Sequence, residues 1–125
     1  MTRLYSLVES ATHPNFSALY RRLKLEEERF GAMRKLLSAV KKRPPDFIVA
    51  EFFYGYSNDY AGITISNLDV LLYSLQKYAP HCRCIVLVAK EEREQVDQLQ
   101  KIFPLHEVLV HPVAEAQMEA ALQQP

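Results

Sequence analysis

The chain carries the stretch Pro45-Asp46-Phe47-Ile48-Val49-Ala50-Glu51 near its middle. From Phe47 the run stays apolar almost without interruption as far as Phe53, which is typical of a strand buried on both faces. Before it, an amphipathic helix at 33–43 is stopped by the two prolines, because proline cannot continue a helix. A buried strand directly after a helix favours a parallel sheet, in which helices connect successive strands.

The rest of the chain shows strands and helices in alternation. Residues 24–30 are read either as a weak edge strand or as more helix. Such alternation with short connections favours a flavodoxin-like doubly wound three-layer α/β sandwich. We expect one domain over residues 1–125 with a five-stranded parallel sheet, or a four-stranded one if 24–30 is helical. The other strands are predicted at 3–8, 84–89 and 107–110, and the other helices at 16–23, 68–75, 91–102 and 114–122.

The composition is that of an ordinary globular domain with no global charge. The 125 residues are enough for one core, and 15 Lys and Arg balance 15 Asp and Glu. This balance argues against nucleic acid as a partner, which would require a basic excess. No apolar stretch approaches the roughly 20 residues that span a bilayer, and the N-terminus lacks the apolar core of a signal peptide. We therefore expect a cytoplasmic protein that does not contact a membrane.

The segment His81-Cys82-Arg83-Cys84 invites a metal site. Structural zinc normally takes four ligands from two spaced pairs, and the other histidines lie on other predicted elements. We interpret the two cysteines as one buried in a strand and one at the surface, without a disulfide framework. We expect no metal and no cofactor.

Three motifs, in their order along the chain, resemble the response-regulator receiver domain of two-component signalling. They are the Pro45–Glu51 stretch, the run Ile85-Val86-Leu87-Val88-Ala89, and Val110-His111-Pro112. That family carries a phosphorylatable Asp on its third strand, Thr/Ser-Ala at the end of the fourth and Lys-Pro after the fifth. The resemblance covers residues 31–122 well, and it implies a function located at the carboxyl ends of the strands.

This chain departs from the family at each position that handles phosphate. Glu51 stands where the resemblance places Asp, Val88 where it places Thr or Ser, and His111 where it places Lys. Glu9-Ser10 replaces the acidic pair that holds Mg²⁺, and serine is a poor ligand for an ion that prefers carboxylate and phosphate oxygens. We therefore predict a degenerate phosphoacceptor pocket, formed by Glu9, Ser10, Glu51, Val88 and His111, that is not phosphorylated.

Two interpretations stay open for Glu51 and for His111. Glu51 either mimics the phosphorylated aspartate and holds the domain in one state, or is a strand-end carboxylate without a role. His111 is either a packed, hydrogen-bonded histidine before a proline turn, or it pairs with Glu51. In the second case the pocket would respond to pH, because histidine changes its charge in the physiological range.

A long loop rich in tyrosine follows the third strand. Long loops in compact domains are usually functional or disordered, and tyrosine offers rigid contact area with a polar tip. We predict that this loop binds a partner, and the alternative is that its tyrosines only pack the loop down. The predicted binding residues are Tyr54, Tyr56, Asn58, Asp59 and Tyr60.

The sequence as a whole predicts a non-phosphorylatable receiver-like signalling or regulatory domain. It would not be an enzyme, and it would act through an unidentified protein partner, with a homodimer formed by its last two helices as a further option. The alternative is a flavodoxin-like small-ligand-binding protein or enzyme that uses the tyrosine loop and Glu51. Against that alternative, the sequence shows no glycine-rich phosphate loop and no nucleophile–base pair.

Overall fold

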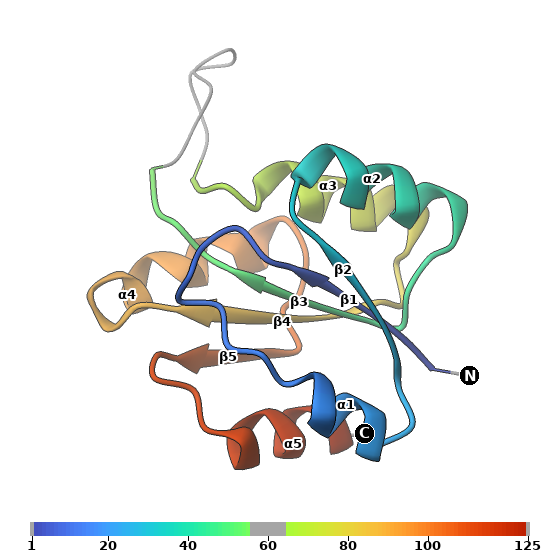
Figure 1. The fold of residues 1–125 in the computed structure, drawn as a ribbon. Helices are drawn as coiled ribbons and strands as arrows, with labels where there is room; N and C mark the ends of the chain where they lie inside the picture. The colour runs from blue at the N-terminus through green and yellow to red at the C-terminus, as the bar shows by residue number, and fades with distance from the viewer. Residues whose placement is uncertain (1, 56–64, 125) are drawn as a thin grey trace.

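The computed structural model describes residues 2–55 and 65–124. Its centre is a parallel sheet of five strands in the order β2-β1-β3-β4-β5. In Figure 1 the arrows of β3, β4 and β5 point to the left. This confirms the flavodoxin-like α/β sandwich. The strands are β1 (Arg3–Leu7), β2 (Glu26–Phe30), β3 (Phe47–Glu51), β4 (Arg83–Val88) and β5 (Glu107–Val110).

Helices cover both faces of the sheet (Figure 1). Helices α2 and α3 lie above it in that view, and α1 and α5 lie below it. Within the described ranges, no helix is long and apolar enough to cross a membrane. The α-helices are α1 (Ser17–Arg22), α2 (Met33–Lys42), α3 (Asp69–Tyr78), α4 (Arg93–Val96) and α5 (Glu115–Gln123).

Two apolar cores lie on the two faces of the sheet, because successive side chains of a strand point to opposite faces. Ile48, Ala50 and Val86 face the helices α2 and α3, whereas Val49 and Ile85 face α1 and α5. The strands predicted to be buried are therefore buried. At the edge of the sheet, β5 is less buried than the central strands, since Val108 is only half-buried.

Residues 24–30, left open by the sequence, contain the edge strand β2. Lys24 takes a left-handed backbone conformation with φ of 62°, which reverses the chain directly after α1. The backbone N–H of Glu26 then donates to the carbonyl of Thr2 (2.8 Å) and starts the pairing with β1. The run of glutamates did not prevent a strand, because an edge strand leaves charged side chains in solvent.

The predicted helix at 91–102 is broken into short pieces. A 3₁₀ turn at Lys90–Glu92 precedes the single turn of α4, and a second 3₁₀ segment runs over Asp97–Lys101. Only Val96 and Leu99 are buried in this stretch. With so narrow an apolar stripe, packing does not enforce regular α geometry.

The start of α3 is not capped by Ser66 or Asn67, although both are residue types that favour the N-cap position. Leu68 occupies the N-cap position without a side-chain cap. Instead, the Asp69 carboxylate accepts hydrogen bonds from the backbone N–H groups of Ile65 and Ser66. Asn67 is turned toward the strand ends, where its side chain takes part in the candidate site.

Candidate functional site

Glu51, the last residue of β3, is the centre of a buried polar cluster at the carboxyl edge of the sheet. Its side chain is 1% exposed. Oε1 accepts a hydrogen bond from the Ser10 hydroxyl (2.9 Å), and Oε2 accepts one from the Thr12 hydroxyl (2.5 Å). Both hydroxyls lie in the connection from β1 to α1, so this one carboxylate ties that connection to the middle of the sheet.

Two imidazoles flank the same carboxylate. His13 Nδ1 lies 3.6 Å from Oε1, and His111 Nε2 lies 3.2 Å from Oε2. The His13 side chain is 2% exposed and that of His111 is 22% exposed. His13 Nδ1 has no hydrogen-bond partner although it is buried. The structure thus brings together His111 and Glu51, as one of the two interpretations of the sequence required.

Burial lowers the pKa of His13 below its ordinary value, because the protonated imidazole would lose its hydration. The negative charge of Glu51 opposes this shift, while Arg29 and His111 add to it and Glu27 opposes it weakly. The balance holds His13 in its neutral form near pH 7. The closest imidazole nitrogen to Oε1 therefore supplies no full positive charge.

Glu9 and Asn67 form a second layer of the cluster. The Asn67 Nδ2 group donates to Glu9 Oε1 (2.8 Å) and to the backbone carbonyl of Glu51 (2.9 Å). Its Oδ1 accepts from the backbone N–H of Phe53 (2.7 Å). The amide thereby links the ends of β1 and β3 to the residue that precedes α3.

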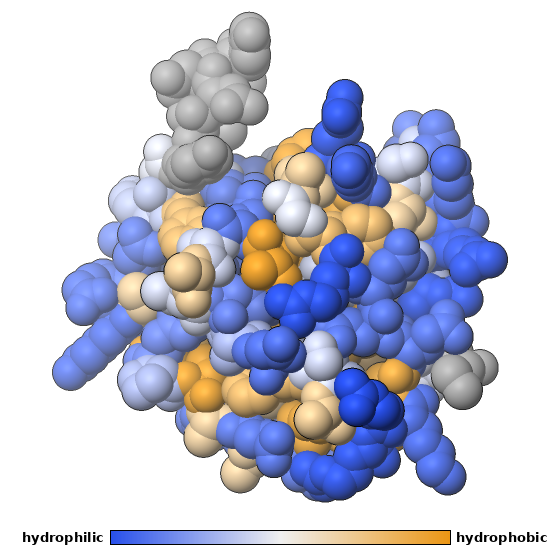
Figure 2. Space-filling model, viewed as in Figure 1, coloured by the Kyte–Doolittle hydropathy of each residue, from blue (hydrophilic) through white to orange (hydrophobic). Residues whose placement is uncertain are grey.

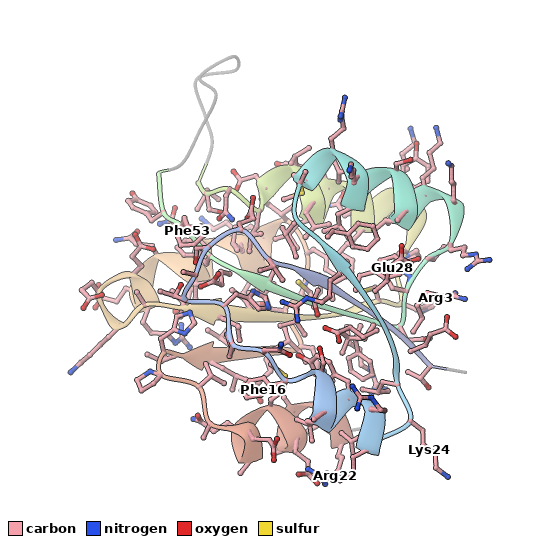
Figure 3. The ribbon with its side chains drawn as sticks, in the orientation of Figure 1. Arg3, Phe16, Arg22, Lys24, Glu28 and Phe53 are labelled. Atoms are coloured by element: carbon pink, nitrogen blue, oxygen red, sulfur yellow. The ribbon has the colours of Figure 1, made fainter. Side chains whose placement is uncertain are left out.

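A pocket of about 790 Å³ opens beside the cluster, and we call it the strand-end pocket. Thr12, Glu51 and His111 contribute polar groups to it, and Lys90 and Glu91 line it from the segment after β4. Figure 3 shows Phe53 where the chain leaves β3, on the side of α4. The apolar lining consists of Pro14, Phe52, Phe53, Ala89, Pro112 and Val113.

Val88 is not placed among the residues that line this pocket. It is fully buried in the core on the α2 and α3 side. Glu51 shares the opposite face of the sheet with Val49, since residues two apart in a strand point the same way. The register pairs Glu51 with Leu87, so the side chain of Val88 is turned away from the carboxylate.

The predicted tyrosine loop is described only at its base. Tyr54 is 48% exposed and its ring stacks on Phe52 at 6.4 Å between centroids. It forms an isolated antiparallel bridge with Ser66. The predicted binding residues Tyr56, Asn58, Asp59 and Tyr60 lie outside the described residues.

The Mg²⁺ site that the resemblance implies does not fit this set of donors. Glu9 Oε1 is taken by Asn67, and both oxygens of Glu51 are taken by hydroxyls. Over residues 2–55 and 65–124, no group of three His, Cys, Asp or Glu side chains is arranged to hold a metal ion.

At the other end of β4, Cys82 and Cys84 are both buried, which corrects the prediction that one lies at the surface.

Comparisons with solved structures identify the fold. A response regulator receiver domain protein from Clostridium thermocellum matches with a TM-score of 0.71 and 15% identity, over 98% of this chain and 91% of that chain. A putative response regulator from Chloroflexus aurantiacus matches with a TM-score of 0.70 and 12% identity, over 98% of each chain. A response regulator protein from Burkholderia pseudomallei, solved with a phosphorylated aspartic acid, a calcium ion and citrate, matches with a TM-score of 0.70 and 19% identity, over 99% of this chain and 68% of that chain.

These likenesses show that the chain has the receiver-type, flavodoxin-like α/β fold. Scans of the sequence against protein-family models and against curated proteins found no match.

Sequence reasoning missed Thr12, His13 and Asn67 as members of the site. A signal was present in the stretch Ser10-Ala11-Thr12-His13, because four small or polar residues directly after a buried strand belong to the functional edge of a parallel sheet.

Proposed function

We propose that this chain is a receiver-like regulatory domain that is not phosphorylated, catalyses no reaction and acts by contact with a protein partner. The receiver fold supports a signalling role, since the solved structures that share it include response regulators. The observation that supports the proposal most directly is that Glu51 is buried and fully hydrogen-bonded. The resemblance places this residue at the position of the phosphorylatable aspartate.

A carboxylate accepts a phosphoryl group only if one of its oxygens approaches the phosphorus in line with the leaving group. The Glu51 side chain is 1% exposed and each of its oxygens already accepts a hydroxyl hydrogen bond. Val88 offers no hydroxyl to a phosphate, and it faces the other core. These contacts favour a carboxylate that serves as a fixed structural anion.

Such an anion supports the interpretation of Glu51 as a permanent substitute for a phosphorylated aspartate. Through Ser10 and Thr12 it holds the β1–α1 connection, and through its backbone carbonyl it contacts Asn67 in front of α3. A domain held in this way presents one surface to its partner at all times. Regulation would then come from the presence of the partner.

Phosphorylation is tested with the intact chain, Mg²⁺ and acetyl phosphate, read by intact mass spectrometry. We expect no phosphoryl adduct, and no beryllofluoride-dependent change in the NMR spectrum. The positive control is a response regulator receiver domain with an intact phosphorylatable Asp, treated in the same way. A stable phosphoryl group on the unmodified chain, at Glu51 or Asp59, would refute the proposal.

Partner binding is tested by affinity capture with the intact chain as bait. The variant combines Tyr54→Ala, Tyr56→Ala and Tyr60→Ala, and the matched control is Tyr73→Ala, an exposed tyrosine on α3. We expect a partner that is captured by the unmodified chain and by the control, and lost with the loop variant. Equal loss with the control would rule out the loop as the contact surface.

A further inference from the structure

We propose that the strand-end pocket binds a small organic ammonium compound with an aromatic or aliphatic body, its charge facing Glu51. This inference is independent of the regulatory role proposed above. It concerns a binding site for a small molecule, whereas that role concerns a protein partner and the absence of phosphorylation. Three observations support it. They are the size and lining of the pocket, the charges at its floor, which is formed by Glu51 and the two imidazoles, and the charges at its rim, which is formed by Lys90 and Glu91.

The dimensions and lining of the pocket are those of a small-molecule site. Ligand pockets of proteins typically enclose about 300–1,000 Å³ and combine apolar walls with a few polar groups. The strand-end pocket encloses about 790 Å³. Its apolar residues come from four separate connections, after β1, β3, β4 and β5, and two of them are the phenylalanines Phe52 and Phe53. On the face shown in Figure 2, apolar side chains gather in several patches between hydrophilic ones.

The floor of the pocket carries a carboxylate without a permanent counter-charge. Buried charges in proteins are normally paired, yet within the described ranges the only ionisable bases within 4.0 Å of Glu51 are the two imidazoles. The sequence of residues 56–64, which follows β3, contains no Lys, Arg or His. His13 is held neutral by burial, and its Nδ1 lacks a hydrogen-bond partner. Within the described ranges, no Lys or Arg side chain therefore pairs with the carboxylate of this floor.

The rim does not supply the missing charge either. Lys90 and Glu91 are exposed neighbours that line the pocket with opposite charges, so the rim is neutral in sum. Selection between cations and anions must then come from the floor. Thr12 lines the same pocket and donates to Glu51 Oε2, so a lone pair of its hydroxyl oxygen can accept an N–H of an ammonium ligand while the hydrogen bond to Glu51 is kept.

An aromatic body suits the walls for a further reason. Phenylalanine rings stack on aromatic groups, and their faces attract cations within about 6 Å. A ligand with a short chain between ring and ammonium places the ring against the partly exposed Phe53 while the charge reaches the floor. A carboxylate ligand of the same shape would instead meet Glu51 as a like charge.

The experiment titrates two probes of the same body and opposite charge into the intact chain, 2-phenylethylammonium and phenylacetate, with ¹H–¹⁵N NMR as readout. We expect the ammonium to bind at least about tenfold more tightly, the ratio produced by one partly shielded ion pair of about 1.4 kcal/mol. The shifted amides should include those of Phe53, Ala89 and Val113. Equal affinity, binding of neither probe, or shifts confined to other surfaces would each overturn the proposal.

Two variants locate the source of the selectivity. Glu51→Gln keeps the shape of the side chain and removes its charge, so the preference for the ammonium should fall to near unity. Glu91→Gln removes a carboxylate from the rim and should leave most of the preference in place. The reverse pattern would assign the selectivity to the rim and refute the role of Glu51. If Glu51→Gln fails to fold, the comparison of the two probes on the unmodified chain still decides the question.

Discussion

Replacing Glu51 by Gln should lower the pKa of His13 further. The carboxylate is the main group that counteracts the effect of burial on this imidazole, and it lies 3.6 Å from Nδ1. At this separation a pair of unit charges interacts by about 1 kcal/mol in a water-like dielectric and by about 5 kcal/mol at an effective dielectric constant of 20. Because 1.36 kcal/mol corresponds to one pKa unit, the drop should be between roughly 1 and 3 pH units.

The assay is an NMR titration of the His13 imidazole in the unmodified chain and in the variant. Glu27→Gln is the matched control, since Glu27 acts on His13 in the same direction but is the weakest contributor. We expect a clear drop for Glu51→Gln and a smaller one for Glu27→Gln. If His13 titrates at the same pH or higher after Glu51→Gln, the two groups are not coupled and the described cluster is wrong.

The same imidazole should make the fold less stable in mild acid. The folded-state pKa of His13 lies below its ordinary value, so below about pH 6.5 the unfolded chain binds a proton that the folded chain does not. The free energy of unfolding should fall as the pH drops from there, and this contribution levels off below the folded-state pKa. Chemical denaturation at pH 7 and pH 5 measures the loss, and His13→Gln should reduce it. An unchanged difference between the two pH values in that variant would contradict the assignment.

Three further predictions concern the fold. Val86→Asp should unfold the chain or lower its free energy of unfolding by several kcal/mol, because it places an unpaired charge in the sheet. Thermal melting tests this, with Val70→Asp at an exposed position as the control. Asp69→Ala should lower the free energy of unfolding by about 1 kcal/mol or somewhat more, because two backbone N–H groups before α3 lose their acceptor. Urea denaturation measures this loss. Burial raises the pKa of the Cys84 thiol to about 12 and also raises that of the Cys82 thiol. Neither cysteine should therefore react with a thiol reagent at pH 8 until guanidinium unfolds the chain.

Each of these has an outcome that would refute it. A melting temperature of Val86→Asp equal to that of Val70→Asp would show that β4 is not a central strand. An Asp69→Ala variant as stable as Glu94→Ala, which changes an exposed carboxylate, would remove Asp69 from the start of α3. Rapid labelling of either cysteine in the native state would place that thiol at the surface.

The sequence by itself determined the architecture and the position of the central carboxylate. Apolar runs such as Phe47–Glu51 and Cys84–Val88 are long enough to be strands and too apolar to lie at a surface, and the helices between them make the sheet parallel. Once the sheet is parallel, the carboxyl ends of its strands meet at one edge. That is why residues as distant as Glu51 and His111 could be assigned to one place from sequence alone.

Only the tertiary structure decided which other groups reach that place. Thr12 and His13 belong to a connection with no regular structure, and their positions depend on hydrogen bonds and burial against Glu51, 38 to 39 residues further along the chain. Local sequence patterns carry no record of such distant contacts. The same limit applies to β2, whose formation depends on pairing with β1, and to Val88, whose side chain is turned from the pocket by the register of β3 and β4. Pairing and register are decided by the packing of the whole domain, because each strand obtains its partners from segments far away in sequence.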